Sequence, residues 1–291
     1  MFEGTWRIYN VTGYAVMLVY LAACAFIVPW RGDPLLGAGA GFAYFLVVWL
    51  VMGFYLGDVV HLGLAHRSLD VKPWFIYFIT YLANTIGIYL NPVTWSNRHR
   101  LHHTYSDRPG DPNKLHDDGF LVTCYRMLFP YPSVAELTKE PIFHTVPMRL
   151  VSNAYFALFS QITSFAIPWV IFGDWRYALV LWVGVRLITA YVHIVQNYWT
   201  HDRRFGSRRY DDEDNAMNIG NWIAVTLTFS ACLQNNHHHA PRFVRLSHHR
   251  DEYDFGFLTV RLLRRLGLAR PSPAGLEIPE GAKLSEVGIA P

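Results

Sequence analysis

Long apolar runs, rather than amphipathic repeats, dominate the pattern of hydrophobic and polar positions along this chain. Four of them approach the length of about 20 residues that crosses the hydrocarbon core of a bilayer. They lie at about residues 12–30, 35–55, 153–172 and 177–198. Short polar loops, Arg31–Pro34 and Gly173–Arg176, connect the first pair of runs and the second pair. The pattern therefore predicts an all-α membrane protein whose four transmembrane helices form two hairpins.

Two shorter apolar stretches, Trp74–Leu90 and Gly220–Leu233, lie between groups of histidines. Both are short for a membrane span. If Trp74–Leu90 crossed the bilayer, the histidine groups before and after it would face opposite sides. We therefore interpret both stretches as re-entrant or surface-lying helices that belong to a helical cap on the spans.

Positively charged residues predict the orientation in the membrane. Of 25 Lys and Arg, only Arg31 and Arg176 lie in the hairpin loops, and Arg186 lies inside the fourth run. The others share one side with both termini and the grouped histidines, and the positive-inside rule makes that side cytoplasmic. We expect residues 1–268 to form a single integral membrane domain. Residues 269–291 are punctuated by Pro and Gly, which predicts a disordered tail.

The composition supports a membrane protein. Hydrophobic residues make up 52% of the chain and charged residues 16%, whereas roughly a quarter of the residues of soluble domains are charged. Ten Trp, 17 Tyr and 19 Phe are typical of aromatic belts at membrane interfaces. The formal net charge of +3 is small and scattered. This argues against a nucleic-acid partner and leaves membrane lipid as the surroundings.

The candidate chemistry lies in the histidines, most of which occur in tight groups. The members of these groups, with two amides that share their spacing, are His61, His66, His99, His102, His103, Asn197, His201, Gln234, His237 and His238. Residues three or four apart share one face of a helix, so most of the groups converge. His61 and His66 are the exception, because five residues place them about 140° apart on an ideal helix. That pair needs a break or another non-ideal helix geometry to bind one ion.

Eight clustered imidazoles indicate metal binding. Neutral imidazole suits Zn, Cu, Fe and Ni, and eight of them exceed the four ligands of a tetrahedral zinc. No inward-facing carboxylates accompany the apolar runs. The sequence thus predicts a histidine-rich di-metal site carried by the cytoplasmic cap. His193 and Arg186 lie inside the fourth run, where a functional role and hydrogen bonding to neighbouring helices are both open.

Longer motifs surround the histidines. His61–Arg67 reads HLGLAHR and Trp95–His103 reads WSNRHRLHH, with Ser106-Asp107 and Asp111-Pro112 following. In order and spacing these motifs resemble those of the membrane fatty acid desaturases, most closely the acyl-CoA desaturase branch, over roughly residues 40–265. Asn197–His201 resembles an additional ligand pair of that family, in which the Asn holds a metal through water.

The third motif departs from the family pattern. The family's third box resembles H-N-N-H-H-A-x-P, whereas this chain reads QNNHHHAP from Gln234. Aligning the Asn-Asn pair puts Gln234 at the first histidine position and makes His237 and His238 ligands, and we prefer this register. Aligning His-His-Ala instead makes His238 and His239 ligands, with Asn235 in the leading position. Either way one imidazole is missing, and an amide oxygen is the poorer ligand.

The resemblance implies a cofactor of two Fe ions (Fe2+/Fe3+), with no catalytic residues beyond the metal ligands. It implies O2-dependent oxidation of an unactivated acyl chain, with fatty acyl desaturation that inserts a C=C bond as the expected reaction. The acyl group would be carried by CoA, by acyl carrier protein or by a lipid. An acyl hydroxylase or acetylenase with the same site is the alternative. A zinc-binding membrane protein without redox chemistry, or a pseudoenzyme, is a more distant one.

Such an oxidation also needs electrons from outside. The chain carries no flavin, nicotinamide or haem-binding motif, so an external electron-transfer protein is implied, such as a ferredoxin or a cytochrome with its reductase. The basic residues Arg203, Arg204, Arg208 and Arg209 fit an acidic electron donor. They fit lipid head groups equally well.

Overall fold

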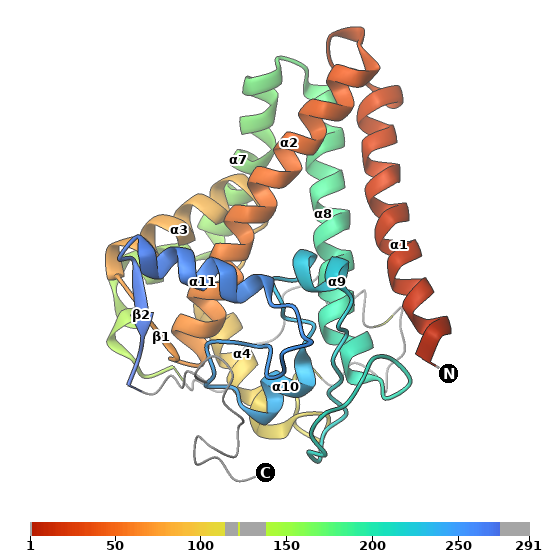
Figure 1. Ribbon diagram of the computed structural model, residues 1–291. Helices are drawn as coiled ribbons and strands as arrows, with labels where there is room; N and C mark the ends of the chain where they lie inside the picture. Colours follow the sequence, from red (N-terminus) through yellow and green to blue (C-terminus); the bar gives the residue numbers. More distant parts are fainter. Residues whose placement is uncertain (1, 114–121, 123–137, 274–291) are drawn as a thin grey trace.

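The computed structural model describes residues 2–113, 122 and 138–273, and these residues are mostly helical (Figure 1). The four longest α-helices are α1 (Phe2–Ala22), α2 (Pro34–Gly53), α7 (Ala154–Phe172) and α8 (Trp175–Asn197). Figure 1 shows that α1 is joined to α2, and α7 to α8, at the same end of the molecule. Each pair forms a helical hairpin, as the sequence predicts.

Three helical segments among the described residues have the length and apolar composition of membrane spans. They are Pro34–Ala65, Ala154–Phe172 and Trp175–His201, and they correspond to the second, third and fourth apolar runs. The first run is also helical, but the apolar part of it, Thr12–Ile27, is shorter. The long apolar helices indicate a membrane protein.

Side-chain contacts at the hairpin turns hold the two hairpins together. The carboxylate of Asp33 accepts hydrogen bonds from the backbone N–H groups of Leu35 and Leu36 and so caps α2. In the same turn, which includes η1 (Ala23–Ile27) and η2 (Trp30–Gly32), Trp30 Nε1 donates to the carbonyl oxygen of Phe172 at 2.8 Å. This bond ties the turn before α2 to the end of α7.

Shorter helices form the end of the molecule opposite to the hairpin turns. They are α3 (Pro73–Ile86), α4 (Pro92–Tyr105), α6 (Val146–Val151), α9 (Trp222–Leu227), α10 (Gln234–His239) and α11 (Phe255–Arg265), with the short turns η5 (Pro141–His144) and η6 (Trp199–His201). Helix α3 has 14 residues and α9 has six, so neither is long enough to cross a bilayer. This agrees with the interpretation of both stretches as helices that do not span.

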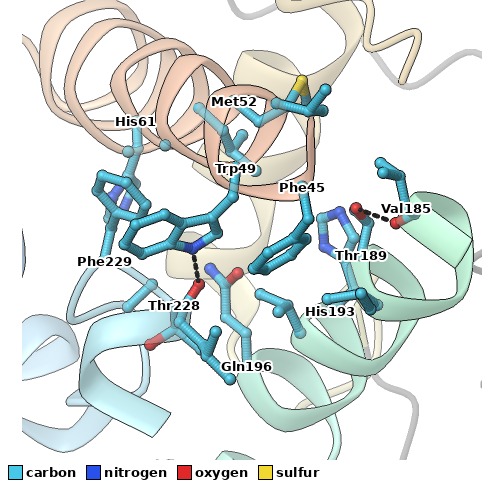
Figure 2. Close-up of a pocket in the computed structure, with 18 of the residues that line it drawn as sticks. Phe45, Trp49, Met52, His61, Val185, Thr189, His193, Gln196, Thr228 and Phe229 are labelled. Atoms are coloured by element: carbon cyan, nitrogen blue, oxygen red, sulfur yellow. Dashed lines mark hydrogen bonds between the residues drawn. The ribbon is translucent and has the colours of Figure 1, made fainter. Parts of the chain in front are cut away.

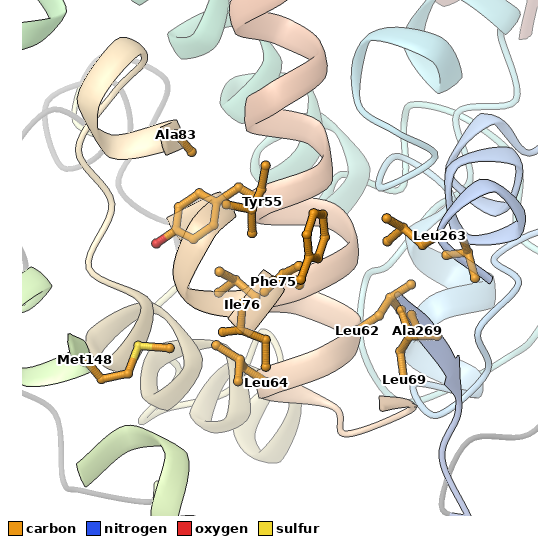
Figure 3. Close-up of a cluster of buried hydrophobic side chains, with 14 of the residues drawn as sticks. Tyr55, Leu62, Leu64, Leu69, Phe75, Ile76, Ala83, Met148, Leu263 and Ala269 are labelled. Atoms are coloured by element: carbon orange, nitrogen blue, oxygen red, sulfur yellow. The ribbon is translucent and has the colours of Figure 1, made fainter. Parts of the chain in front are cut away.

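The largest hydrophobic core lies where α2 continues into η3 (Phe54–Ala65), a π-helix (Figure 3). Tyr55 of η3 packs there with Phe75 of α3, Met148 of α6 and Leu263 of α11, and all four are buried. Full burial of a large apolar side chain stabilises a fold by about 1.5–3 kcal/mol. The core therefore fixes η3, which carries His61 and ends directly before His66, against three helices of the cap.

A small antiparallel sheet closes the described part of the chain. Strand β1 (Leu69–Val71) pairs with β2 (Ala269–Pro271), with Leu69 opposite Pro271. The tail was predicted to begin after Leu268, and this boundary is too early because Ala269–Pro271 pairs with β1. Residues 274–291 of the predicted tail lie outside the described residues.

Candidate metal centre

Five imidazoles from three helices meet in the cap, and we call them the first cluster. They are His61 of η3 and His66 directly after η3, His99 and His103 of α4, and His237 of α10. The Nε2 atoms of His61 and His237 lie 3.0 Å apart, and those of His66 and His99 lie 2.8 Å apart. The Nε2 atom of His103 lies 3.1 Å from that of His99 and 3.0 Å from that of His237. The five rings thus direct the same nitrogen towards one point.

The π-helical geometry of η3 explains how His61 and His66 face the same point. In a π-helix the hydrogen bond that closes each turn joins residues five apart. Here the backbone N–H of His66 donates to the carbonyl oxygen of His61 at 3.0 Å. The non-ideal geometry that this spacing requires is therefore present, as a wide helix turn rather than as a break.

Three further imidazoles form the second cluster, which consists of His102 of α4, His201 of η6 and His238 of α10. Their candidate ligand atoms lie within 4.8 Å of one another. The ring centroids of His103 and His238 are only 4.6 Å apart, so the two clusters are adjacent. The structure brings all eight grouped histidines together.

Two pairs of consecutive histidines divide between the clusters. His102 and His103 follow each other on α4, and His237 and His238 follow each other on α10. Successive residues of an α-helix are rotated by about 100°. One member of each pair therefore faces the first cluster, and the other faces the second.

The donor atoms of the first cluster fit a cation. Burial, reinforced by the neighbouring imidazoles, lowers the pKa of His66, His99, His103 and His237 well below 6.5. These rings are therefore neutral at pH 7, which is the form that binds metal ions. Neutral rings that direct Nε2 lone pairs at one another repel, unless a cation or a proton lies between them. A purely imidazole donor set suits a first-row transition metal.

Each imidazole of the second cluster contacts a carboxylate through its other ring nitrogen, Nδ1. The pairs are His102 with Asp111 at 2.9 Å, His201 with Asp107 at 3.0 Å, and His238 with Asp214 at 2.6 Å. A carboxylate in this position accepts the Nδ1 proton and leaves the Nε2 lone pair available to a metal ion.

These three carboxylates are ionised. Burial acts to raise the pKa of Asp107, but the contact with His201 and the backbone N–H of Asn215 outweighs it, and the pKa falls to about 2. Burial also opposes the lowering of the pKa of Asp111 and Asp214, and the hydrogen bonds from their histidines prevail. The second cluster is therefore surrounded by negative charge.

Sequence reasoning did not assign a role to these carboxylates. Asp107 and Asp111 belong to the Ser-Asp and Asp-Pro pairs that follow the second histidine motif, so a signal was present. Asp214 lies in a loop far along the chain from α4, and its position in the sequence gives no sign of the contact with His238.

The geometry of the third motif favours the register that aligns the Asn-Asn pair. His237 and His238 enter the two clusters, whereas His239 stacks on Tyr210 with 3.8 Å between ring centroids. Asn235 is fully engaged elsewhere: its Oδ1 atom accepts the backbone N–H groups of Arg209 and Tyr210. The geometry therefore disfavours the register in which Asn235 and His239 would be ligands.

Each of the two predicted amides forms a hydrogen bond to the backbone through its side-chain nitrogen. Gln234 is buried on α10, and its side-chain nitrogen donates to the carbonyl oxygen of Ala231 at 2.6 Å. On α8 the side-chain nitrogen of Asn197 donates to the carbonyl oxygen of His193 at 3.0 Å. In both residues the nitrogen is held by backbone, which leaves the oxygen as the atom to face a metal ion or its water.

An apolar cavity adjoins the first cluster (Figure 2). The space between its walls, together with the open solvent at its mouth, amounts to about 710 Å³. Phe45, Trp49 and Met52 of α2 line one side, Val185 of α8 lies opposite, and His61 forms part of the wall. The cavity therefore runs from between the apolar helices to the imidazoles.

His193 and Arg186, the ionisable residues of the fourth run, have different surroundings. His193 lines the cavity together with Gln196 (Figure 2). Arg186 donates to Gln161 Oε1 at 2.8 Å and to Ser164 Oγ at 3.0 Å, and it lies over the Trp182 ring. Arg186 thus forms hydrogen bonds between α7 and α8, whereas His193 is placed to contact a molecule in the cavity.

The four arginines proposed for docking an electron donor contact groups of their own chain. Arg204 pairs with Asp202 at 2.6 Å and Arg209 with Asp251 at 2.7 Å. Arg208 lies 3.6 Å from Asp214, and Arg203 donates to the carbonyl oxygen of Asp214 at 2.8 Å. These contacts reduce the positive charge that the patch presents.

Long apolar helices that carry two adjacent groups of buried imidazoles at one end define a histidine-rich membrane protein. The model of the fatty acid desaturase family matches residues 39–253 of the chain. The chain belongs to the fatty acid desaturase family, and it is an oxidoreductase of the desaturase type.

Several characterised desaturases are similar to this chain. The sn-1 stearoyl-lipid 9-desaturase of Anabaena variabilis is 29% identical over 232 residues, which cover 77% of this chain and 80% of the relative. Delta-9 acyl-lipid desaturase 1 of Arabidopsis thaliana is 26% identical, with 77% and 72% covered. The acyl-CoA C20 Delta5-desaturase of Anemone leveillei is 25% identical, with 72% and 66% covered. The relatives thus include enzymes named for lipid-bound and for CoA-bound acyl groups.

Proposed function

We propose that the protein is an O2-dependent fatty acyl desaturase that inserts a C=C bond into an acyl chain at a di-iron centre. One observation carries the proposal: the apolar cavity between α2 and α8 ends at His61, a member of the first cluster. An acyl chain held in the cavity would therefore reach the imidazoles of the first cluster. The names of the relatives, which describe acyl-lipid and acyl-CoA desaturases, support the same reaction.

The two clusters are the proposed ligands of two iron ions. The first ion would be held by His61, His66, His99, His103 and His237, and the second by His102, His201 and His238, with Gln234 as a weak ligand and Asn197 acting through water. An iron pair at this position supplies the O2-dependent redox chemistry that removes hydrogen from an unactivated methylene. Burial of the imidazoles keeps bulk water away from that chemistry.

The residues around the cavity position the acyl chain. Trp95 lies between the cavity and the first cluster: its ring stacks on His99 with 4.6 Å between centroids and meets His61 edge-on at 5.9 Å. Because Trp95 is held by both imidazoles, it can fix the distance between the acyl chain and the cluster. Phe229 and Met52 add apolar walls, which favour an acyl tail over a polar substrate.

The membrane arrangement completes the proposal. Four spans in two hairpins place both termini and the clusters on the cytoplasmic side, where the acyl carrier and an external electron-transfer protein have access. The carrier is CoA, acyl carrier protein or a lipid, and the donor is a ferredoxin or a cytochrome with its reductase. The grouping of Lys and Arg away from the hairpin turns supports this orientation.

Fatty acid profiling of cells tests the proposal. Cells that express the wild type with an adequate electron donor are compared with cells that express His102→Ala or His144→Ala. His102 belongs to the second cluster, whereas His144 is exposed on η5 and serves as the matched control. We expect a new unsaturated product with the wild type and with His144→Ala, and none with His102→Ala.

Other results of the same comparison would lead to other functions. A product that gains oxygen would identify a hydroxylase, and a triple bond would identify an acetylenase. Identical lipid profiles for the wild type and His102→Ala, with about one zinc and no iron bound to the purified protein, would identify a zinc-binding protein without redox chemistry. Any of these three results would overturn the proposed desaturation.

A further inference from the structure

The two clusters differ in the groups that contact the Nδ1 atoms of their imidazoles. Every ring of the second cluster donates from Nδ1 to a carboxylate, at distances of 2.6 to 3.0 Å. In the first cluster the Nδ1 atom of His237 is buried and has no hydrogen-bond partner. Among the described residues, no carboxylate forms an ion pair with any first-cluster imidazole. The second cluster, which has only three imidazoles, is thus the one whose imidazoles are hydrogen-bonded to carboxylates.

The three carboxylates are held rigidly by backbone groups. Asp111 accepts the backbone N–H groups of Asp107 and Asn113 at 2.8 and 2.7 Å. Asp107 accepts the backbone N–H of Asn215 at 2.8 Å, and Asp214 accepts that of Ala216 at 3.0 Å. Because each carboxylate is fixed before any ion binds, each can set the orientation of the imidazole that it contacts.

The local charge also distinguishes the second cluster. Three buried or nearly buried carboxylates surround it, and buried charges are costly unless they are paired. Within the described residues, Arg208 lies 3.6 Å from Asp214, while Asp107 and Asp111 contact histidines of the cluster. A cation bound by the three imidazoles would offset the negative charge of these carboxylates.

We propose that Asp107, Asp111 and Asp214 are positioning residues that keep the second cluster loaded with metal although it has only three imidazoles. Each carboxylate fixes the Nδ1–H form of its histidine and makes the Nε2 atom a stronger donor. Together they offset the imidazole that is absent at Gln234. This inference rests on the proposed function, because it takes the clusters to be metal ligands.

Metal titration of the purified full-length protein tests the inference. Metal-free protein in detergent is titrated with Co2+, whose visible spectrum reports binding to imidazoles, and the bound metal is counted after gel filtration. The variants are Asp107→Asn, Asp111→Asn and Asp214→Asn. Asp212→Asn is the matched control, because Asp212 contacts Nδ1 of His239 at 3.2 Å and His239 belongs to neither cluster.

We expect wild type and Asp212→Asn to bind two equivalents. Each of the other three variants should bind its second equivalent about 10- to 100-fold more weakly, the usual effect of removing such a partner. Their first equivalent should be unchanged, which also shows that the variant has folded.

Three results would overturn the inference. Two unchanged equivalents in all three variants would show that the carboxylates do not support metal binding. Equal weakening of both equivalents, with an unchanged gel-filtration profile, would show that they do not act on one cluster. A wild type that binds no transition metal would overturn the proposed function itself, and the inference with it.

Discussion

Gln234 and Ala231 are joined by a hydrogen bond of 2.6 Å, from the side-chain nitrogen of Gln234 to the carbonyl oxygen of Ala231. Gln234 lies four residues before His238 on α10, so the two side chains share a face of the helix. The bond holds an amide where the related motif has an imidazole. In the register that aligns the Asn-Asn pair, the second cluster therefore has an amide at the position of a fourth histidine.

Replacing Gln234 with histidine should strengthen metal binding by the second cluster. Imidazole is a better ligand than an amide oxygen for transition metals, and we expect a gain of about tenfold in the affinity for the second equivalent, or about 1.4 kcal/mol. Competition between Gln234→His and a chelator of known affinity measures this gain. Gln234→Leu, which has no ligand atom, is the control. Equal affinities for all three proteins would show that position 234 does not face the metal.

Removing His239 should leave the reaction intact, whereas removing His238 should abolish it. The two residues are adjacent, but His238 belongs to the second cluster and His239 stacks on Tyr210. His239→Ala is expected to retain most of the product formed by the wild type, and His238→Ala is expected to form none. Product and protein are quantified in the same cells. The reverse result would establish the other register of the third motif.

Filling the far end of the cavity should shift the products towards shorter acyl chains. Val185 is buried and lines the cavity, and Figure 2 shows it on the side away from His61. Val185→Phe adds volume there and leaves less room for the acyl tail. Val183→Phe is the control, because Val183 is 41% exposed on another face of α8. The ratio of product chain lengths is measured by mass spectrometry, and an unchanged ratio in Val185→Phe would place the acyl tail elsewhere.

Replacing His248 with glutamine should make stability less sensitive to acid. Burial, followed by the nearby His239, His249 and Arg245, lowers the pKa of His248 from 6.5 to about 3. As the pH falls below about 6.5, the unfolded chain therefore binds a proton that the folded chain does not, and stability is lost progressively towards pH 3. Above pH 6.5 this effect is absent.

Without that imidazole, the slope of unfolding free energy against pH should decrease by up to about 1.4 kcal/mol per pH unit. Denaturant unfolding of wild type and His248→Gln between pH 7 and pH 4 measures the two slopes. Parallel slopes would mean that His248 takes up its proton equally well in the folded protein.

The sequence predicts the helical elements and the set of histidines that come together because both depend on local patterns. The apolar runs that became α2, α7 and α8 are continuous, and His99, His102 and His103 lie within little more than one helical turn. Residues so close on one helix lie near one another whatever the rest of the fold does. The same reasoning identified Gln234 as the departure from the pattern.

Features that depend on contacts between segments distant in the sequence cannot be predicted from local patterns. The division of His237 and His238 between two clusters requires the position of α10 relative to α4 and η6. The role of Asp214 requires the path of the loop that precedes α9. The pairing of β1 with β2 joins residues about 200 positions apart, so no local sequence pattern predicts it.

The wide turn of η3 links the number of residues between two ligands to the type of backbone that carries them. His61 and His66 can serve one ion because the chain between them closes as i to i+5. An ordinary α-helical turn would need histidines three or four apart for the same purpose. An insertion or deletion between His61 and His66 would therefore disturb this pair of ligands more than a substitution between them would. It would also shift the later elements of the cap relative to η3.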